Sequence, residues 1–267
     1  MIIVASCGHL SDDERIYYKQ INTLKKISNS IEYFTYNQST NVIDDDGVNH
    51  YHFNSKIYSQ SQYKKKLLEF TLNHEPCILH IHDLELLSVA RRVKLKNKNI
   101  KIIYDIHEDL LSVWDTFSSY SGIIKKIINT TLSKIELFHL KYIDCCIVAN
   151  KFADLNRYKK FAPVYVIQNF PLKNNIGDAT NIKAPYKLIY HGQLDESRGI
   201  INLIDAFNRL SKRYNQLELK IIGTARKKRF NNIIHNRVKN NYKIEILESV
   251  PHADIWDILY DAHIGII

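Results

Sequence analysis

Hydrophobic and polar positions follow a regular alternation along the 267-residue chain. Short apolar runs of strand length are separated by segments whose apolar residues recur every three or four positions, as on one face of a helix. The predicted strands are 2–6, 31–36, 48–53, 78–81, 101–104, 145–149, 164–167, 188–190, 217–222, 244–247 and 264–267. The predicted helices are 16–27, 63–72, 84–93, 123–142, 151–160, 200–214, 230–239 and 254–261. This alternation predicts an α/β protein with parallel sheets and right-handed crossovers.

Residues 172–186 (LKNNIGDATNIKAPY) lose the periodicity and collect Asn, Gly and Pro, which is typical of a linker. The linker predicts two Rossmann-like domains, residues 1–171 and 187–267. The second domain has four predicted strands, and no helix follows the last one. Because a parallel sheet needs cover on both faces, we expect this domain to be incomplete. The sequence is then either a fragment or a naturally short chain.

The composition is that of a globular protein with a core, with 45% hydrophobic and 24% charged residues. No apolar run reaches the ~18 residues of a membrane-spanning helix. The N-terminal MIIVASCGHL has no basic leader and is interpreted as the first strand. The four cysteines show no C-x-x-C spacing, so we expect a reduced, cytoplasmic protein.

The net charge of +9 is concentrated in one region, because residues 209–243 hold eleven Lys/Arg and one acid, Glu218. A basic surface attracts phosphates, which nucleic acids, anionic lipids and nucleotide-linked substrates all carry. The cluster RKKR at 226–229 has no interleaved aromatic residues, so we do not predict nucleic-acid binding. The alternative is that the basic residues of 209–243 only form the solvated face of a helix.

Candidate binding residues follow several predicted strands. In KLIYHGQLDESRG, residues 187–199, a strand ends at Gly192 and a helix begins after Gly199, an arrangement that presents backbone N–H groups to a phosphate. Many such turns bind nothing, and the glycines are also explained by backbone geometry alone. Gly223 follows the strand 217–222 and is expected at the same edge of the sheet.

In the first domain, a glycine and several polar residues lie just after the strands. They are Gly8, His82, Asp83, Asp105, His107 and Glu108. Parallel strands end at a common edge, where ligand sites of α/β proteins form. The motifs HIHD and DIHE lack the spacing of a zinc site, so no metal is predicted.

Six motifs in order resemble the GT-B glycosyltransferases, and more narrowly glycosyltransferase family 4, the group 1 enzymes. They are DDERIYYKQINTLKK, HIHDLELL, IIYDIHEDL, VIQNFP, HGQLDESRGIINLIDAF with LELKIIGTA, and VPHADIWDILYDAHIGII. The resemblance implies transfer of a sugar from a UDP- or GDP-sugar to a glycan or lipid-linked acceptor. It implies retention of configuration, no metal and no cofactor, since the nucleotide sugar is a substrate. Surface polysaccharide synthesis is the expected setting.

The resemblance also implies roles for individual residues. His107 would lie next to the transferred sugar, with Gly8, His82, Asp83, Asp105 and Glu108 on the acceptor side. Gly192, Gln193, Arg198, Gly199 and Gly223 would bind the donor. Gln193 departs from the family, which usually has a cation there, while Arg198 keeps one. The family's pair of glutamates, eight positions apart, is expected beyond residue 267.

The helix 123–142 places lysines beside isoleucines, as on helices that rest on anionic membranes, here expected at the inner face. The alternative is a helix packed on its own sheet. Two other functions stay open for the chain: a sugar-nucleotide epimerase of the same fold, and a non-catalytic fragment or partner subunit.

Overall fold

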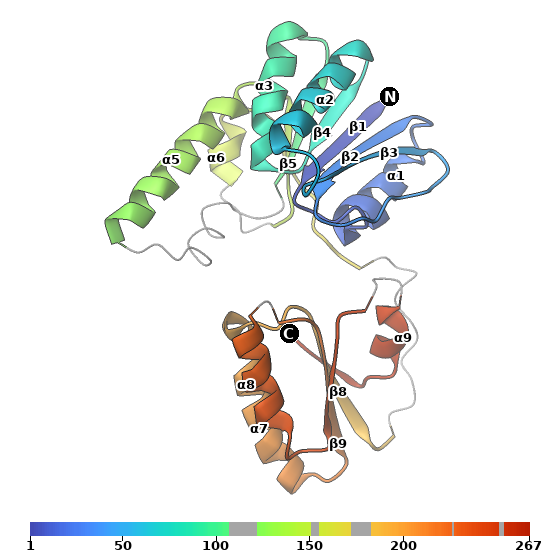
Figure 1. Ribbon diagram of the computed structural model, residues 1–267, viewed down its shortest axis with the longest axis vertical. Helices are drawn as coiled ribbons and strands as arrows, with labels where there is room; N and C mark the ends of the chain where they lie inside the picture. The colour runs from blue at the N-terminus through green and yellow to red at the C-terminus, as the bar shows by residue number, and fades with distance from the viewer. Residues whose placement is uncertain (107–121, 151–154, 172–182, 226, 251–253) are drawn as a thin grey trace. The chain divides into compact units, whose positions relative to one another are not determined.

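The computed structural model describes residues 1–106, 122–150, 155–171, 183–225, 227–250 and 254–267 (Figure 1). The chain forms two compact units, Met1–Phe170 and Pro171–Ile267. We call them the first and the second unit and describe each by itself.

The first unit is built on a seven-stranded parallel sheet with the order β3-β2-β1-β4-β5-β6-β7. The strands are β1 (Ile2–Cys7), β2 (Ile31–Asn37), β3 (Val48–Asn54), β4 (Ile78–Ile81), β5 (Lys101–Ile106), β6 (Cys145–Val148) and β7 (Val164–Val166). The strand order reverses between β1 and β4. At such a switch point the loops after neighbouring strands diverge and leave room for a ligand.

Helices cover both faces of this sheet (Figure 1). They are α1 (Asn22–Leu24), α2 (Gln60–Asn73), α3 (Leu87–Lys96), α5 (Gly122–Leu140) and α6 (Leu155–Lys159), with a 3₁₀ turn, η2 (Leu84–Leu86). A π-helix, η1 (Glu14–Ile21), runs into α1, where the sequence predicted one regular helix over 16–27. It begins at Asp13, whose side chain accepts hydrogen bonds from the N–H groups of Arg15 and Ile16.

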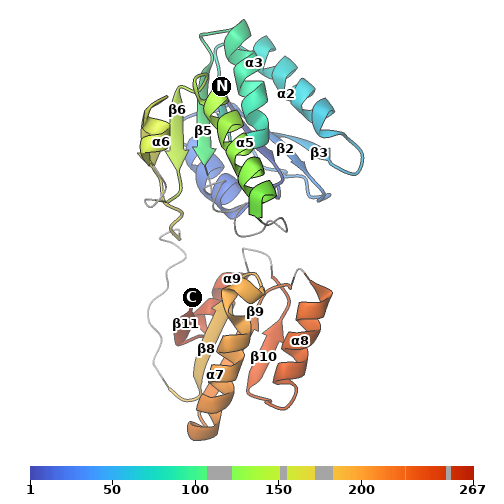
Figure 2. The same ribbon diagram turned by 90° about the vertical axis from the view of Figure 1, so that its left-hand side faces the viewer.

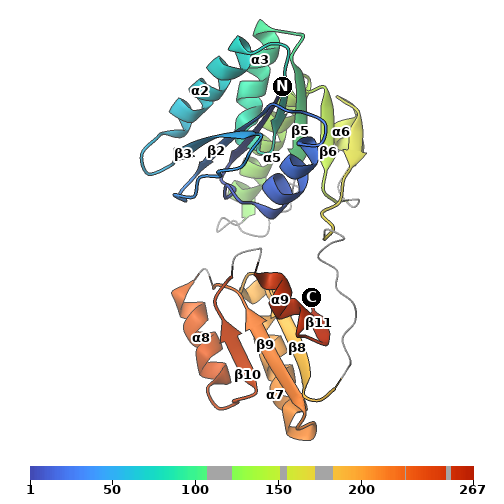
Figure 3. The same cartoon turned by 90° about the vertical axis from the view of Figure 1, so that its right-hand side faces the viewer.

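The second unit has a four-stranded parallel sheet with the order β10-β9-β8-β11. Its strands are β8 (Tyr186–His191), β9 (Leu217–Ile222), β10 (Ile244–Leu247) and β11 (Ile264–Ile266). The helices α7 (Ile200–Arg213) and α8 (Lys228–Val238) pack on one face, around Phe207, Ile221 and Ile234. The short α9 (Ile255–Tyr260) packs on the other, around Ile222. Figures 2 and 3 show these two faces.

Both sheets confirm the predicted α/β class with parallel strands. Within the described residues, no helix combines the length and the apolar character needed to cross a bilayer. The predicted helix 151–160 is helical over Leu155–Lys159, and residues 151–154 lie outside the described part.

Candidate functional site

The second unit brings Gly192 and Gly223 into direct backbone contact. Each follows a strand, and each has a positive φ, 149° and 155°. A Cβ atom on Gly223 would lie 1.9 Å from the carbonyl oxygen of Gly192, so only glycine fits. Gly192 N–H donates to Ile222 O at 3.0 Å, and Gly223 N–H donates to Leu247 O at 3.0 Å. The carboxyl ends of β8, β9 and β10 are thereby fixed beside one another.

Polar side chains gather in the loops after these strands. Thr224 Oγ1 donates to Glu248 Oε2 at 3.2 Å and is hydrogen-bonded to Ser249 Oγ at 2.8 Å. The main-chain oxygen of Gln193 accepts from Tyr190 Oη at 2.9 Å. Gln193 Nε2 is buried and has no hydrogen-bond partner within the described part of the chain. A buried donor without a partner costs free energy, so a ligand oxygen here would be stabilised.

A cation and a helix N-terminus follow the glycine contact along the chain. Arg198 ends the 3₁₀ turn η4 (Glu196–Arg198) and is exposed, and its guanidinium makes no hydrogen bond or ion pair to another described residue. Gly199 has a left-handed φ of 69° and precedes α7 without supplying a side-chain cap. The first N–H groups of α7 are therefore free of side-chain partners, as in helix N-termini that bind phosphate.

In the first unit, Asp83 joins the loops after β4 and β1. Its carboxylate accepts from the Cys7 N–H at 2.6 Å and lies 3.3 Å from His9 Nε2. His9 Nδ1 lies 3.2 Å from the carboxylate of Asp13. Burial lowers the pKa of His9, but the hydrogen bonds to Asp13 and Asp83 outweigh it and raise the pKa to about 10. His9 is thus an imidazolium held between two carboxylates, beside the predicted residue Gly8. Sequence reasoning did not identify His9.

Asp105 has no exposed surface. Its carboxylate accepts from Arg15 Nη2 at 3.0 Å and from Gln20 Nε2, and His80 Nε2 lies 3.6 Å away. Burial raises the pKa of Asp105, but the interactions with His80, His82 and Arg15 outweigh it and hold the pKa well below its usual range. Asp105, predicted on the acceptor side, is thus buried at the end of β5, where its carboxylate is bound by side chains of the same unit.

Arg15 connects this carboxylate with the end of β7, because its Nη1 donates to the main-chain oxygen of Ile167 at 2.9 Å. Arg15 is 6% exposed, so both contacts are shielded from solvent. His82, predicted at the acceptor side, is also buried, at 3% exposure, with its ring 4.5 Å from that of His80. His107 and Glu108 lie outside the described residues.

Among the described residues, one group could ligate a metal ion: His80, His82 and Asp105, whose ligand atoms lie within 4.8 Å of one another. The Arg15 guanidinium already binds the Asp105 carboxylate and would repel a divalent cation. We therefore assign these side chains to the buried charge network below the edge of the sheet.

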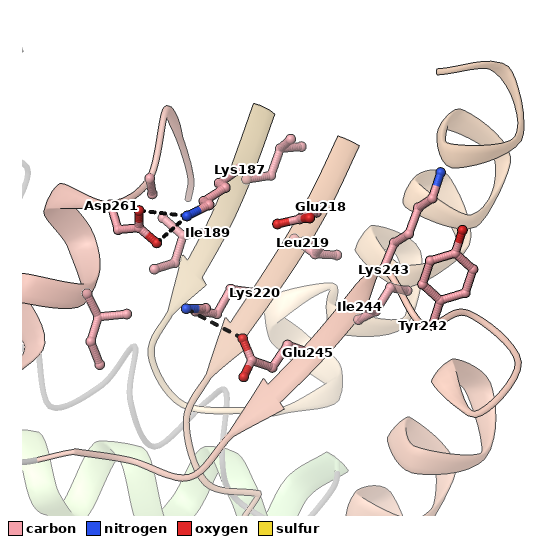
Figure 4. A pocket seen from close by; sticks show the side chains of 13 residues that line it. Lys187, Ile189, Glu218, Leu219, Lys220, Tyr242, Lys243, Ile244, Glu245 and Asp261 are labelled. Carbon is pink, nitrogen blue, oxygen red and sulfur yellow. Dashed lines mark hydrogen bonds and ion pairs between the residues drawn. The ribbon is translucent and has the colours of Figure 1, made fainter. Parts of the chain in front are cut away.

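A concave region of about 460 Å³ opens on the second unit at the amino-terminal halves of β8, β9 and β10 (Figure 4). Four of the charged side chains that line it form ion pairs, with Lys187 Nζ 2.6 Å from Asp261 and Lys220 Nζ 3.4 Å from Glu245. Ligands of parallel sheets bind at the carboxyl ends of the strands, so this region is not the predicted donor site.

Comparisons with known proteins agree with this architecture. The family model described as Glycosyl transferases group 1 matches residues 173–267. The apo structure of OtsA is 12% identical, with a TM-score of 0.66, over 99% of this chain and 77% of that chain. The structure of Anabaena Alr3699/HepE in complex with UDP is 13% identical, with a TM-score of 0.64, over 99% and 73%.

A trehalose-phosphate synthase (UDP-forming) from Burkholderia vietnamiensis is also similar, at 10% identity and a TM-score of 0.64, over 99% and 77%. No curated protein sequence matches the chain significantly. The match over 173–267 contains the glycine contact, Gln193, Thr224 and Arg198. The chain therefore has the GT-B glycosyltransferase fold, and its second unit matches the glycosyl transferases group 1 family.

Proposed function

We propose that this protein transfers a sugar from a nucleotide-diphosphate donor, a UDP- or GDP-sugar, to an acceptor hydroxyl with retention of configuration and without a metal ion. The observation that carries the proposal is the Gly192–Gly223 contact, followed by an exposed Arg198 guanidinium with no partner among the described residues and by the uncapped start of α7. Similar solved structures support it, since one is a complex with UDP and another is a trehalose-6-phosphate synthase studied for glycosyltransfer with retention.

Sugar transfer from a nucleotide diphosphate requires positive charge near the leaving group. As the glycosidic bond breaks, the departing nucleotide diphosphate gains negative charge, which must be stabilised by cations and N–H dipoles. Arg198 can bind two phosphate oxygens at once. The Gln193 amide can donate a hydrogen bond but supplies no charge, so Arg198 has the larger share of this task.

The first unit would hold the acceptor, with His107 beside the transferred sugar and Gly8, Asp83 and His9 in the neighbouring loops. His107 would position and polarise the sugar, and the acceptor proton would leave on a phosphate oxygen of the donor. Asp105, Arg15 and His80 would support the strand end that carries His107. The expected setting is synthesis of a surface polysaccharide or lipid-linked glycan in the cytoplasm.

The helix α5 supports a peripheral contact with an anionic membrane. Its outward face exposes Ile123 at 78% and Ile127 at 59%, with Lys126 and Lys134 also exposed. The one acid of this helix, Glu136, is buried and paired with Arg157. The exposed face thus combines apolar and basic side chains without a carboxylate, which suits the surface of an anionic bilayer. The opposite face packs on the unit through Leu140.

Transfer is tested by incubating the full chain with individual UDP- and GDP-sugars and a panel of glycan and lipid-linked acceptors. Release of UDP or GDP, together with a product heavier by one sugar, is the expected result. Conversion of the nucleotide sugar without an acceptor would identify an epimerase instead. Nucleotide binding without turnover of any donor would favour the partner-subunit alternative.

Membrane contact is tested separately by flotation with phosphatidylcholine vesicles that contain or lack phosphatidylglycerol. The chain is expected to float only with the anionic vesicles, and Ile127→Glu is expected to abolish flotation. Leu95→Glu, at another exposed apolar position on α3, is the matched control. Equal flotation with both vesicle types would contradict an electrostatic contribution to this contact.

A further inference from the structure

The first unit contains a cavity of about 470 Å³ at the carboxyl ends of β1, β2 and β3. This volume lies within the ~300–1,000 Å³ of small-molecule sites. The residues that line the cavity are Cys7, Gly8, Leu10, Tyr36, Asn37, Gln38, Ser39, Ser55, Gln60 and Glu85. It therefore adjoins Gly8, the residue predicted on the acceptor side.

Part of this lining forms a fixed polar frame. Asn37 Nδ2 donates to His9 O at 2.8 Å, and its Oδ1 accepts from the Ser39 N–H at 2.8 Å. Gln60 Nε2 donates to Cys7 Sγ at 3.1 Å, and its Oε1 accepts from Lys64. These contacts use both ends of each amide, so the two side chains hold the shape of the cavity.

Other lining groups are available to a ligand. The side chains of Tyr36, Gln38, Ser55 and Glu85 make no hydrogen bond to another described residue. Their hydroxyl and amide groups can both donate to and accept from sugar hydroxyls, and the Glu85 carboxylate can accept from them. The Tyr36 ring is stacked on Tyr63, with centroids 5.4 Å apart, and Leu10 is 57% exposed. The cavity thus also has apolar surface.

The charge of the lining separates two classes of sugar. Among the described residues that line the cavity, Glu85 is the one charged side chain, and none is a Lys or Arg. Near the cavity, Asp83 and Asp13 both contact the His9 ring, and Lys64 Nζ donates to Gln60 Oε1 at 3.1 Å. A phosphate group would meet the Glu85 carboxylate without a lining cation, and like charges at close range repel. A sugar hydroxyl would instead donate a hydrogen bond to that carboxylate.

We infer that this cavity binds an uncharged, hydroxyl-rich sugar unit of the acceptor and discriminates against a sugar phosphate. This inference rests on the proposed function in assigning the ligand to the acceptor. The binding preference itself is a property of the cavity and is measurable without turnover. Glu85 acts as the residue that sets the specificity.

The experiment is saturation-transfer NMR on the full chain with methyl α-D-glucopyranoside, methyl N-acetyl-β-D-glucosaminide and glucose 6-phosphate. We expect both glycosides to bind and glucose 6-phosphate to bind at least about tenfold more weakly than either. Glu85→Gln should weaken glycoside binding about tenfold, the loss expected for one hydrogen bond to a charged group. Glu85→Lys should reverse the order in favour of the phosphate.

Glu69→Lys on α2 is the matched control, because it makes the same charge change at an exposed position outside the lining. Binding of glucose 6-phosphate as tight as that of the glycosides would overturn the inference. Absence of binding by both glycosides, or an equal effect of the two lysine variants, would overturn it as well. UDP binding is measured in the same samples. If UDP fails to bind while the glycosides do, the donor proposal is wrong and the cavity assignment stands.

Discussion

The substitution Gly223→Ala tests the close contact between Gly192 and Gly223 at the carboxyl ends of β8 and β9. The added methyl carbon would lie 1.9 Å from Gly192 O and 3.2 Å from a side-chain carbon of Leu194, where ordinary contact begins near 3.4 Å. The neighbouring atom is backbone, so β8 and β9 must separate at their carboxyl ends. Overpacking costs about 1–3 kcal/mol. Alanine at a φ of 155° adds a further strain of about 1–3 kcal/mol. We expect a loss of about 2–6 kcal/mol in the free energy of unfolding of the second unit.

The assay is urea unfolding followed by the fluorescence of Trp256, which packs with Ile222 in the second unit. Replacement of the other tryptophan, Trp114, by Phe makes Trp256 the single reporter. Two glycines provide controls. Gly199→Ala meets no atom within 4 Å but keeps a left-handed φ of 69°, so its expected cost is about 1–2 kcal/mol.

Gly265→Ala meets no atom and has no positive φ, so it should change stability by less than about 1 kcal/mol. The same midpoint for Gly223→Ala and Gly265→Ala would refute the close approach of the two strand ends. UDP binding is also measured without urea, where the Gly223→Ala variant is folded. Weaker binding there would show that the contact also shapes the nucleotide site.

Three further predictions concern the first unit. His9→Gln should remove stability that is full below pH ~6.5 and is lost as the pH rises through about 10, because the folded-state pKa is raised. The difference in unfolding free energy from wild type, measured against pH, should shrink over that range, and a constant difference would contradict it. Arg15→Met should destabilise the unit by about 3–5 kcal/mol by removing the cation that pairs with a buried carboxylate, and Asp105→Asn in the same chain should restore part of the loss in urea unfolding. His107→Ala should lower the rate of sugar transfer and leave UDP affinity unchanged in calorimetry, and unchanged transfer would exclude a role for His107.

The sequence predicted the order of strands and helices because apolar periodicity and turn residues are local signals. It also identified Gly192 and Gly223 one by one. Their contact depends on the parallel pairing of β8 with β9, which no local pattern contains. Thr224, Glu248 and Ser249 carried only the weak signal of following a strand.

The burial of Asp105 could not be predicted from the sequence either, because it also depends on a contact between residues far apart in the chain. Its partner Arg15 lies 90 residues away in the sequence, just before the predicted helix 16–27, and no local pattern links the two residues. The π-helix that turns Arg15 inward has no clear signature in the apolar pattern. The net charge of +9 gave no sign of the Glu85 carboxylate in the lining of the first unit's cavity, because a charge count does not say where a side chain lies.

The most direct test of the account is calorimetric titration of UDP and GDP into the full chain and into Arg198→Ala. Arg213→Ala, the same change at the last residue of α7, is the control. The account predicts that one of the nucleotides binds and that Arg198→Ala weakens it about tenfold or more, as for the loss of a charged hydrogen bond, while Arg213→Ala has no effect. Absence of binding by both nucleotides, or equal affinity in the two variants, would contradict a donor site at the start of α7.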